Sequence, residues 1–233
     1  MNIIINEKLI QRNKRIGNIS SIVGISILVI GLILNINPTP ERTTIAFGAL
    51  IVGFIISQVS TFFVTRFSRS PRYDEIFAEN LNKLNNKYSF YVYRGPIPML
   101  LVGPSALWIP VPVSASGEIY YDKKWRQKGG SFFLKLFGQE NLGRPALDIE
   151  SNEKAVRKFF SVHFDDQSLP PIKCILVSLH PKAKIGDVEE APYPIVEAEA
   201  LRRKIRKIDR DSGEEISRET LDIINDLLEN SKR

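Results

Sequence analysis

The stretch IGNISSIVGISILVIGLILN, residues 16–35, contains no Lys, Arg, Asp or Glu, and neither does TTIAFGALIVGFIISQVSTFFVT, residues 43–65. Each stretch reaches the roughly 20 apolar residues that an α-helix needs to cross about 30 Å of hydrocarbon. The turn Asn-Pro-Thr-Pro-Glu-Arg separates them, and its prolines cannot continue a helix. The sequence therefore predicts two transmembrane helices joined as a tight hairpin.

Basic side chains flank the hairpin at both of its outer ends, whereas its tip carries only Arg42 beside Glu41. The flanking residues are Lys8, Arg12, Lys14 and Arg15 before the first span and Arg66, Arg69 and Arg72 after the second. Because Lys and Arg accumulate on the cytoplasmic side, we expect a multi-pass protein of the cell (inner) membrane with both termini cytoplasmic. A second span follows almost at once, which argues against a cleaved signal peptide.

Glycines recur at a seven-residue interval in the first span, at Gly17, Gly24 and Gly31, and the second span contains Gly48 and Gly53. Small residues on one face let two membrane helices approach closely. The alternative is the ordinary glycine content of membrane helices, and the sequence alone leaves both interpretations open.

Composition limits the function classes that remain. The net charge of +6 and the pI of about 9.4 come partly from the juxtamembrane clusters, so they do not by themselves indicate a nucleic-acid partner. The only cysteine, Cys174, lies in an apolar run. This excludes a disulfide framework and a thiolate metal site, and it favours a small buried side chain in a reducing cytosol.

Hydrophobic periodicity after the spans predicts an α/β domain built on a mixed sheet. The expected helices cover residues 73–85, 150–162, 195–208 and 217–228, and the expected strands cover 88–94, 99–102, 106–113, 117–121 and 172–179. Residues 172–179 form a continuous apolar run, which is typical of an interior strand. We expect four segments: a cytoplasmic N-terminal segment 1–15, the hairpin 16–65, the α/β domain 66–210 and a C-terminal amphipathic helix 211–233.

Two stretches of the domain carry specific expectations. Pro110 and Pro112 cannot donate to a sheet ladder, so the run from Trp108 to Val113 must be an edge, a bulge or a strand end. The run from Ser131 to Gly138 contains three phenylalanines, which favours core packing over a position at the lipid interface.

The order of elements from Tyr73 to Ile208 resembles the nuclease-related domain (NERD), a restriction-endonuclease-like α/β family often attached to membrane spans in bacteria. The residues that carry the resemblance are the acidic helix start at Asp74 and Glu75, Leu100 to Pro104 with Leu107 to Ile109, Gly117 to Ile119 leading to Trp125, Gly143 to Pro145, and Ile172 to Leu179. The resemblance implies a membrane-anchored, restriction-endonuclease-like mixed sheet of about 135 residues.

The resemblance also implies where a nuclease would hold its metal: an Asp at the start of one strand and a Glu-x-Lys near the end of the next, around a magnesium-like ion. These positions fall near Pro98, Pro110 and Pro112, and a shift of one residue recruits only apolar side chains. Proline supplies neither a ligand nor a base. We therefore expect no catalytic, metal-binding or cofactor-binding residues and no cofactor.

Other polar clusters offer weaker substitutes for the missing set. Glu118, Asp122, Lys123 and Lys124 lie close in sequence, but no second strand is known to bring a carboxylate beside them. Asp165 and Asp166 follow His163, and His180 precedes Pro181 at a strand end. Solvated loops commonly carry such clusters, so a displaced metal site is the less favoured interpretation.

Two features are candidate partner surfaces. The first is a basic run on the predicted helix 195–208, consisting of Arg202, Arg203, Lys204, Arg206, Lys207 and Arg210. It can face water, anionic lipid or phosphate backbones. The second is the apolar stripe Leu221, Ile224 and Leu228 on the last helix, which needs either a partner or a dock on its own domain.

The favoured function is a noncatalytic membrane-anchored interaction or scaffold protein with a degenerate nuclease-like cytoplasmic domain. Its expected partners are the lipid bilayer and either another protein or a second copy of the chain, and nucleic acid is possible but not favoured. The alternatives are a divergent metal-dependent nuclease at the membrane and a nucleic-acid binder without catalysis.

Overall fold

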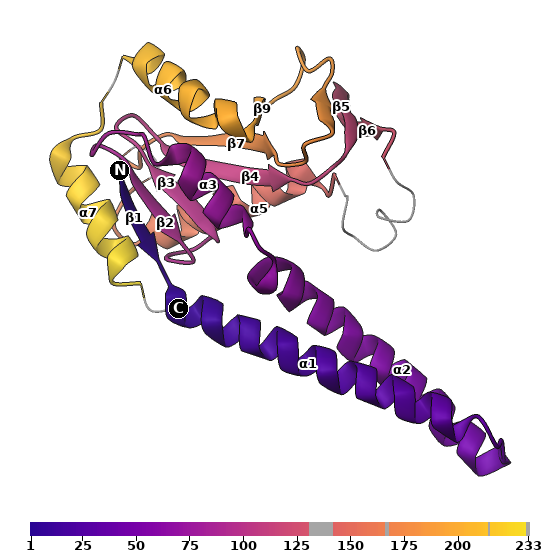
Figure 1. The fold of residues 1–233 in the computed structure, drawn as a ribbon. Helices are drawn as coiled ribbons and strands as arrows, with labels where there is room; N and C mark the ends of the chain where they lie inside the picture. Colours follow the sequence, from indigo (N-terminus) through magenta and orange to yellow (C-terminus); the bar gives the residue numbers. More distant parts are fainter. Residues whose placement is uncertain (131–141, 166–167, 214, 232–233) are drawn as a thin grey trace. The chain divides into compact units, whose positions relative to one another are not determined.

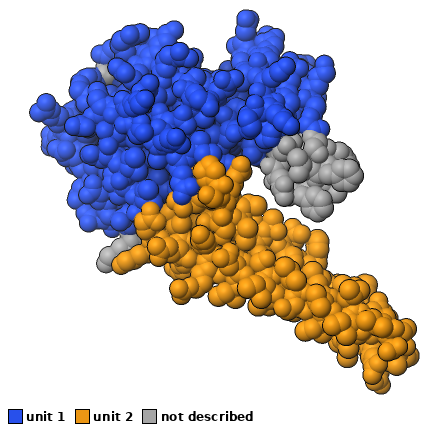
Figure 2. Space-filling model, in the orientation of Figure 1, with its two compact units in different colours: residues 1–5, 73–233 blue, residues 6–72 orange. Residues whose placement is uncertain are grey.

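The computed structural model describes residues 1–130, 142–165, 168–213 and 215–231. The chain forms two compact units, which Figure 2 colours separately. Unit 1 combines Met1–Ile5 with Tyr73–Arg233, and unit 2 is Asn6–Arg72. Unit 2 is therefore inserted into the sequence of unit 1.

Unit 2 is a helical hairpin. It consists of α1 (Glu7–Leu34), α2 (Pro40–Phe63) and a π-helical turn, η1 (Val64–Ser68). The Asn6 side chain caps α1 by accepting from the Leu9 N–H at 3.1 Å, so the first helix begins well before the apolar stretch itself. Both long helices are apolar and extended enough to cross a membrane, and most of their side chains are exposed, unlike those of a soluble core helix.

The small residues of the hairpin lie where its two helices touch. Gly17, Gly24 and Gly31 are the buried glycines of α1, and Ala46, Gly53 and Ser60 are the buried residues of α2. A Cβ atom on Gly24 would lie 3.2 Å from the Ile56 Cγ2 atom. The Ser60 hydroxyl also donates to the Gly17 carbonyl at 3.1 Å. The three glycines at seven-residue spacing thus lie at the contact between the two helices of the hairpin, whereas Gly48 has open space around it.

Unit 1 is built on a six-stranded sheet with the order β1-β2-β3-β4-β7-β9 (Figure 1). The strands are β1 (Asn2–Ile5), β2 (Ser89–Val92), β3 (Met99–Val102), β4 (Leu107–Val113), β7 (Ile172–Ser178) and β9 (Ile195–Glu197). β1 and β2, β4 and β7, and β7 and β9 pair in parallel, while β3 is antiparallel to both of its neighbours. The mixed α/β architecture predicted from the sequence is confirmed.

A second sheet has the order β6-β5-β8 and consists of β5 (Gly117–Asp122), β6 (Lys124–Lys128) and β8 (Ala183–Ile185). β6 lies in a polar stretch in which no strand was expected. Its side chains alternate between exposed and buried around Trp125, and β5 supplies its antiparallel partner. The Phe-rich run from Ser131 to Gly138 lies outside the described residues.

The N-terminal residues form an edge strand rather than a plain cytoplasmic segment. Asn2 to Ile5 pair in parallel with Ser89 to Val92. The Met1 ammonium group donates to the Leu84 carbonyl at 3.1 Å and to Asn86 Oδ1 at 3.3 Å. Three consecutive isoleucines favour a strand, but the run is very short and its partner strand lies on the far side of the hairpin in sequence. No local pattern could therefore reveal it.

β4 accommodates its two prolines because only one side of its second half is paired. β3 pairs with β4 only at Trp108 and Leu107, whereas β7 pairs along the full length of β4. The Leu107 N–H points towards β7, where it donates to the Pro171 carbonyl at 2.9 Å. Backbone donors alternate along a strand, so Pro110 and Pro112 lack only N–H groups that would face away from β7. The proline half of this strand is thus a local edge, as predicted.

Helices cover both faces of the large sheet. α5 (Pro145–Phe160) and α7 (Arg218–Glu229) contribute Ile149, Val156, Phe160, Ile224 and Leu228 to one apolar core. α3 (Tyr73–Leu81) and α6 (Leu201–Ser212) contribute Phe77, Leu81, Leu201 and Ile205 to the other. β7 places alternate side chains in the two cores, which is the interior position that its continuous apolar run predicts.

Two expectations about the C-terminal helices need correction. The last helix forms where expected, as α7, but its apolar stripe is not free for a partner, because Ile224 and Leu228 are fully buried and Leu221 packs against the same core. The apolar stripe proposed as a partner surface therefore docks on its own domain. Residues 195–208 are not one helix: β-branched Ile195 and Val196 pair with β7, and a 3₁₀ turn, η2 (Ala198–Ala200), precedes α6.

Candidate functional site: a basic groove beside a buried aspartate

α6 separates buried from charged side chains along its length. Leu201, Ile205 and Asp209 are its buried residues and recur every four positions. The charges face outward at Arg203, Arg206, Lys207 and Arg210, which lie along one side of the helix. The helix ends at Gly213, whose positive φ of 69° suits glycine. α6 thus presents a continuous basic face above a packed one.

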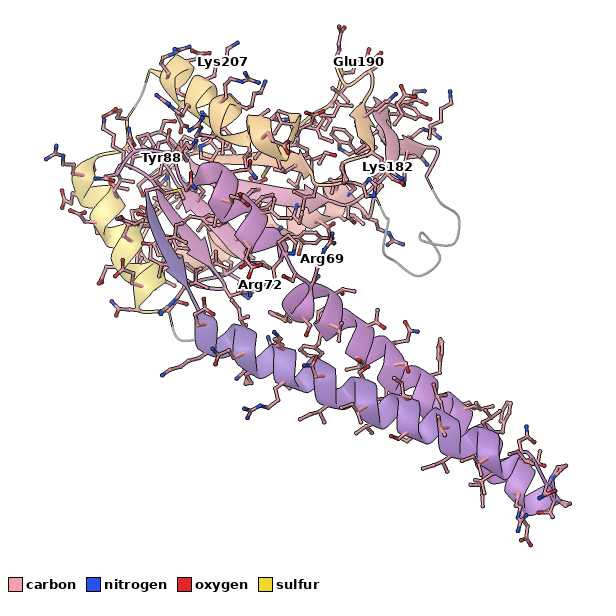
Figure 3. All side chains as sticks on the ribbon, in the orientation of Figure 1. Arg69, Arg72, Tyr88, Lys182, Glu190 and Lys207 are labelled. Atoms are coloured by element: carbon pink, nitrogen blue, oxygen red, sulfur yellow. The ribbon has the colours of Figure 1, made fainter. Side chains whose placement is uncertain are left out.

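The basic face borders a groove of about 680 Å³. α6 forms one wall, and the segment before β2 together with the turn between β3 and β4 forms the other. Figure 3 shows Lys207 on α6 and Tyr88 at the start of the neighbouring strand. The lining residues are Asn85, Lys87, Tyr88, Pro104, Ser105, Arg202, Arg203, Arg206, Lys207, Asp209, Arg210 and Glu215.

Asp209 fixes the base of the groove through three hydrogen bonds. Its Oδ1 accepts from the Ser105 hydroxyl at 2.6 Å and from the Trp108 indole N–H at 3.0 Å. Its Oδ2 accepts from the Tyr88 hydroxyl at 2.7 Å. Asp209 is only 8% exposed, so the carboxylate is held by donors from three separate segments. This cluster ties α6 to β4 and to the start of β2.

Glycine in the β3–β4 turn leaves room for this cluster. A Cβ atom on Gly103 would lie 3.1 Å from the Tyr88 ring and 3.2 Å from Asp209 Oδ2. The far end of α6 is held separately, because the Lys173 ammonium donates to the Ser212 hydroxyl at 2.6 Å. Contacts at Asp209 and Ser212 therefore hold the C-terminal half of the helix that carries the basic face.

The cluster keeps its phenol protonated. Burial raises the pKa of Tyr88 well above its ordinary value, and the hydrogen bond to Asp209 and the charge of that carboxylate raise it further. Arg206 acts in the opposite direction but more weakly. Tyr88 therefore donates to Asp209 at all physiological pH values.

The positive charge of the groove is largely uncompensated. Lys87 pairs with Glu215 at 2.7 Å, and Arg210 lies 3.6 Å from an Asp211 oxygen. In the described parts of the chain, the remaining groove cations, Arg202, Arg203, Arg206 and Lys207, have no ion-pair partner. Asp209 keeps its negative charge, because its three donors are neutral groups, but the cations that line the groove outnumber Asp209 and Glu215. The surface is thus suited to an anionic partner.

Of the six predicted basic residues, five line the groove and one does not. Arg202, Arg203, Arg206, Lys207 and Arg210 line the groove, whereas Lys204 does not. Sequence reasoning missed Lys87, Tyr88, Ser105 and Trp108, which reach the site from distant segments. One signal was present: Asp209 continues the four-residue repeat of Leu201 and Ile205, and an acid on an apolar helix face implies buried donors.

The positions that a nuclease would use for its metal remain apolar. Pro98 precedes β3, where its carbonyl accepts from the Tyr93 N–H at 2.7 Å, and Pro110 and Pro112 lie within β4. Across residues 1–130, 142–165, 168–213 and 215–231, no three His, Cys, Asp or Glu side chains form a group that could hold a metal ion.

The substitute clusters do not converge either. Glu118 and Asp122 lie at opposite ends of β5, and Asp122 faces Arg126 at 3.3 Å. Lys123 occupies the tight turn with a positive φ of 56°, and Lys124 opens β6. The His180 Nδ1 atom accepts from the Lys182 N–H at 3.1 Å, which is a local turn contact. His163 and Asp165 follow α5, and Asp166 lies outside the described residues.

Cys174 is an inert core side chain. It is 7% exposed in β7, and burial, followed by the charge of Glu153, raises the pKa of its thiol to about 12. A thiol with such a pKa stays protonated at neutral pH and is a poor nucleophile.

The chain matches no protein-family model, no curated protein and no solved structure. The resemblance to the nuclease-related domain therefore stays a prediction.

Proposed function

We propose that this chain is a noncatalytic, membrane-anchored interaction platform. The hairpin α1–α2 lies in the bilayer, and the α/β domain stands at the cytoplasmic face, where the groove beside α6 binds an acidic surface of a protein partner. The charge bias of the flanking residues supports a cytoplasmic domain.

The observation that carries this proposal is the insertion of the hairpin into one folded unit. Met1–Ile5 precede α1 and residues from Tyr73 follow α2, yet both belong to unit 1. β1 is hydrogen-bonded into the sheet of that unit, which supports a hairpin whose two ends lie on the same side of a membrane. Two covalent connections then hold the domain at the bilayer.

The groove favours carboxylates over nucleic-acid bases. Arg side chains bind carboxylates with two parallel hydrogen bonds, and the groove offers several Arg side chains without acidic partners. Proteins that bind single strands usually add exposed aromatic rings on which bases stack. The aromatic rings at this groove, Tyr88 and Trp108, are 4% and 1% exposed. An acidic protein surface is therefore the better match.

The prolines favour a platform over an enzyme. Pro98, Pro110 and Pro112 stand where the resemblance would require an acid, an acid and an amine. A degenerate nuclease-like scaffold keeps the sheet and its surfaces while it loses the metal.

Purification of the full-length chain in mild detergent tests the proposal. The affinity tag belongs at the C-terminus, because the Met1 ammonium group is hydrogen-bonded within the fold. We expect a defined protein complex that is lost in the triple variant Arg203→Glu, Arg206→Glu, Lys207→Glu. The control Lys124→Glu, Lys182→Glu, Lys184→Glu makes the same charge change on the small sheet and should keep the complex. Equal recovery from both variants would remove the groove from the proposal.

Nucleic-acid binding is the second candidate, because the same uncompensated cations could meet phosphates. Binding of a single-stranded oligonucleotide by the full-length chain should then weaken steeply with salt. The triple groove variant should flatten that dependence, and the small-sheet control should not.

A further inference from the structure

α7 carries an acidic face opposite the side that it buries. Ile224 and Leu228 are fully buried in the core. Four acids are exposed on the outer side of the helix: Glu219, Asp222, Asp226 and Glu229. They recur every three or four residues, so they form one row along the helix. Ile223 lies within this row and is 40% exposed.

These acids lack cationic partners in the described parts of the chain. Asp226 accepts a hydrogen bond from Asn230 on the same stretch, at 2.7 Å, which leaves its charge uncompensated. Within residues 1–130, 142–165, 168–213 and 215–231, the side chains of Glu219 and Asp222 form no hydrogen bond or ion pair. The Arg94 guanidinium donates to the main-chain carbonyl of Glu229 at 2.9 Å, so one cation lies at the C-terminal end of the row. The molecule thus presents one mainly basic and one mainly acidic helix face.

The two faces are complementary in charge and in spacing. The cations Arg203, Arg206 and Arg210 recur along α6 at the same three- to four-residue interval as the acids along α7, and Lys207 lies beside Arg206. On both helices this interval places successive charges about 5 Å apart along the axis. The exposed Ile223 side chain would rest on the aliphatic stems of the Arg residues.

One copy of the chain cannot bring these faces together. α6 packs on one side of the large sheet with α3, and α7 packs on the other side with α5 (Figure 1). α7 begins beside the groove, since the Ile216 N–H donates to the Pro104 carbonyl at 2.7 Å. Ile224 and Leu228, however, bury the helix in the core opposite that of α6, so the docked α7 cannot lay its acidic row in its own groove.

We infer that the acidic face of α7 docks in the α6 groove of a second copy of this chain. The inference rests on the proposed function, because it names the protein partner of the same groove. Exposed ion pairs contribute little individually and are screened by salt, so this contact is weak between freely diffusing molecules. Anchoring both copies in one bilayer raises their effective concentration and makes the contact effective there.

Mixed charge reversal tests the inference directly. The basic-face variant is Arg203→Glu, Arg206→Glu, Lys207→Glu, and the acidic-face variant is Asp222→Lys, Asp226→Lys, Glu229→Lys. Full-length chains are labelled with donor and acceptor dyes and reconstituted together in neutral phosphatidylcholine vesicles, where energy transfer reports pairing. Circular dichroism confirms that each variant is folded.

The wild type should pair in low salt and lose pairing in high salt. In each reversed variant alone, every contact between α6 and α7 joins like charges, so the variant should pair at least about tenfold more weakly. The mixture of the two variants should recover pairing, since the acid-substituted α6 of one then meets the lysine-substituted α7 of the other. The small-sheet control Lys124→Glu, Lys182→Glu, Lys184→Glu should behave as wild type.

Wild-type chains that stay monomeric at every salt concentration would overturn the inference, as would variants that pair like wild type or a mixture that does not recover. A monomeric wild type that still captures another protein through the groove would leave the proposed function standing. If the wild-type chain neither pairs nor captures another protein through the groove, the proposed function is contradicted as well.

Discussion

At the scale of single residues, Asp209 organises the site. It sits on the buried side of a basic helix, yet its three hydrogen bonds come from donors on three other segments. A buried carboxylate with every oxygen engaged resists reorientation. Asp209 therefore fixes the part of α6 that carries Arg206 and Lys207, although it is itself buried.

Replacing Asp209 tests this role. Asp209→Ala leaves the Tyr88 and Ser105 hydroxyls and the Trp108 indole without their acceptor, and each buried orphan costs about 1–3 kcal/mol. We expect the free energy of unfolding to fall by about 3–5 kcal/mol in thermal or denaturant unfolding of the detergent-solubilised chain. The matched control Asp211→Ala lies two residues away on the exposed side of α6 and should change stability by less than about 0.5 kcal/mol. Equal changes in the free energy of unfolding at the two positions would show that the Asp209 cluster does not stabilise the fold.

Buried phenols make the domain sensitive to alkaline pH. Burial is the main cause that raises the pKa of both Tyr88 and Tyr91 above the ordinary value of 10.0. The protonated phenol is thus favoured in the folded state, and the resulting stability is fully present below about pH 10 and lost above it. We expect the melting temperature to fall between about pH 10 and 11, and Tyr88→Phe should reduce the slope. An unchanged slope in this variant would show that Tyr88 is not linked to unfolding.

At the scale of elements, the hairpin depends on which glycines face the partner helix. A side chain on Gly24 would press on Ile56 and Ser57, whereas Gly48 has nothing within 4 Å. Gly24→Leu should therefore separate the helices, while Gly48→Leu should be tolerated. Cysteines introduced by Gly31→Cys and Ala49→Cys report the contact, because their Cβ atoms would lie about 3.1 Å apart. A small outward shift brings this distance into the range of about 3.5–4.5 Å that a disulfide needs. Disulfide formation should slow markedly only in the Gly24→Leu background, and equal rates would contradict this packing.

The N-terminal strand offers a second test at this scale. Ile4 and Ile5 pack against the two opposite cores of unit 1, whereas Ile3 is 40% exposed. Ile4→Asn and Ile5→Asn should each lower the free energy of unfolding by about 1–2 kcal/mol. Ile3→Asn should have little effect in the same unfolding measurement. If all three variants melted like wild type, β1 would not be a structural part of the sheet.

Elements with a strong local pattern were predictable from the sequence, and those defined by distant partners were not. The apolar spans, the run from Ile172 to Ser178 and the proline-bearing strand β4 have compositions that indicate their environments. β1 and β9 are too short to show a period, and only their pairing with β2 and β7 makes them strands. The same reason explains the site: the basic row of α6 was visible, but Tyr88, Ser105 and Trp108 meet Asp209 only after folding.

At the scale of the whole molecule, the order of the units along the chain restricts the topology of the protein in a membrane. A sheet that contains residues from before and after the hairpin cannot be split across a membrane. The apolar stripe of α7 also finds its place at this scale, since the domain itself covers Leu221, Ile224 and Leu228. Apart from Ile223, the large side chains that stay exposed on the described parts of α6 and α7 are mostly charged, which is why partner binding is assigned to charged faces.

Site-directed labelling of the hairpin tip and of the domain tests the membrane-anchored platform most directly. Asn37→Cys lies in the turn between α1 and α2, and Glu190→Cys lies on an exposed loop of the domain, in a background in which the buried Cys174 is replaced by Ala. In sealed cells a membrane-impermeant maleimide should label Asn37→Cys and spare Glu190→Cys, and inverted vesicles should give the opposite pattern. Labelling of both sites from the same side, or release of the chain from membranes by carbonate, would contradict the account.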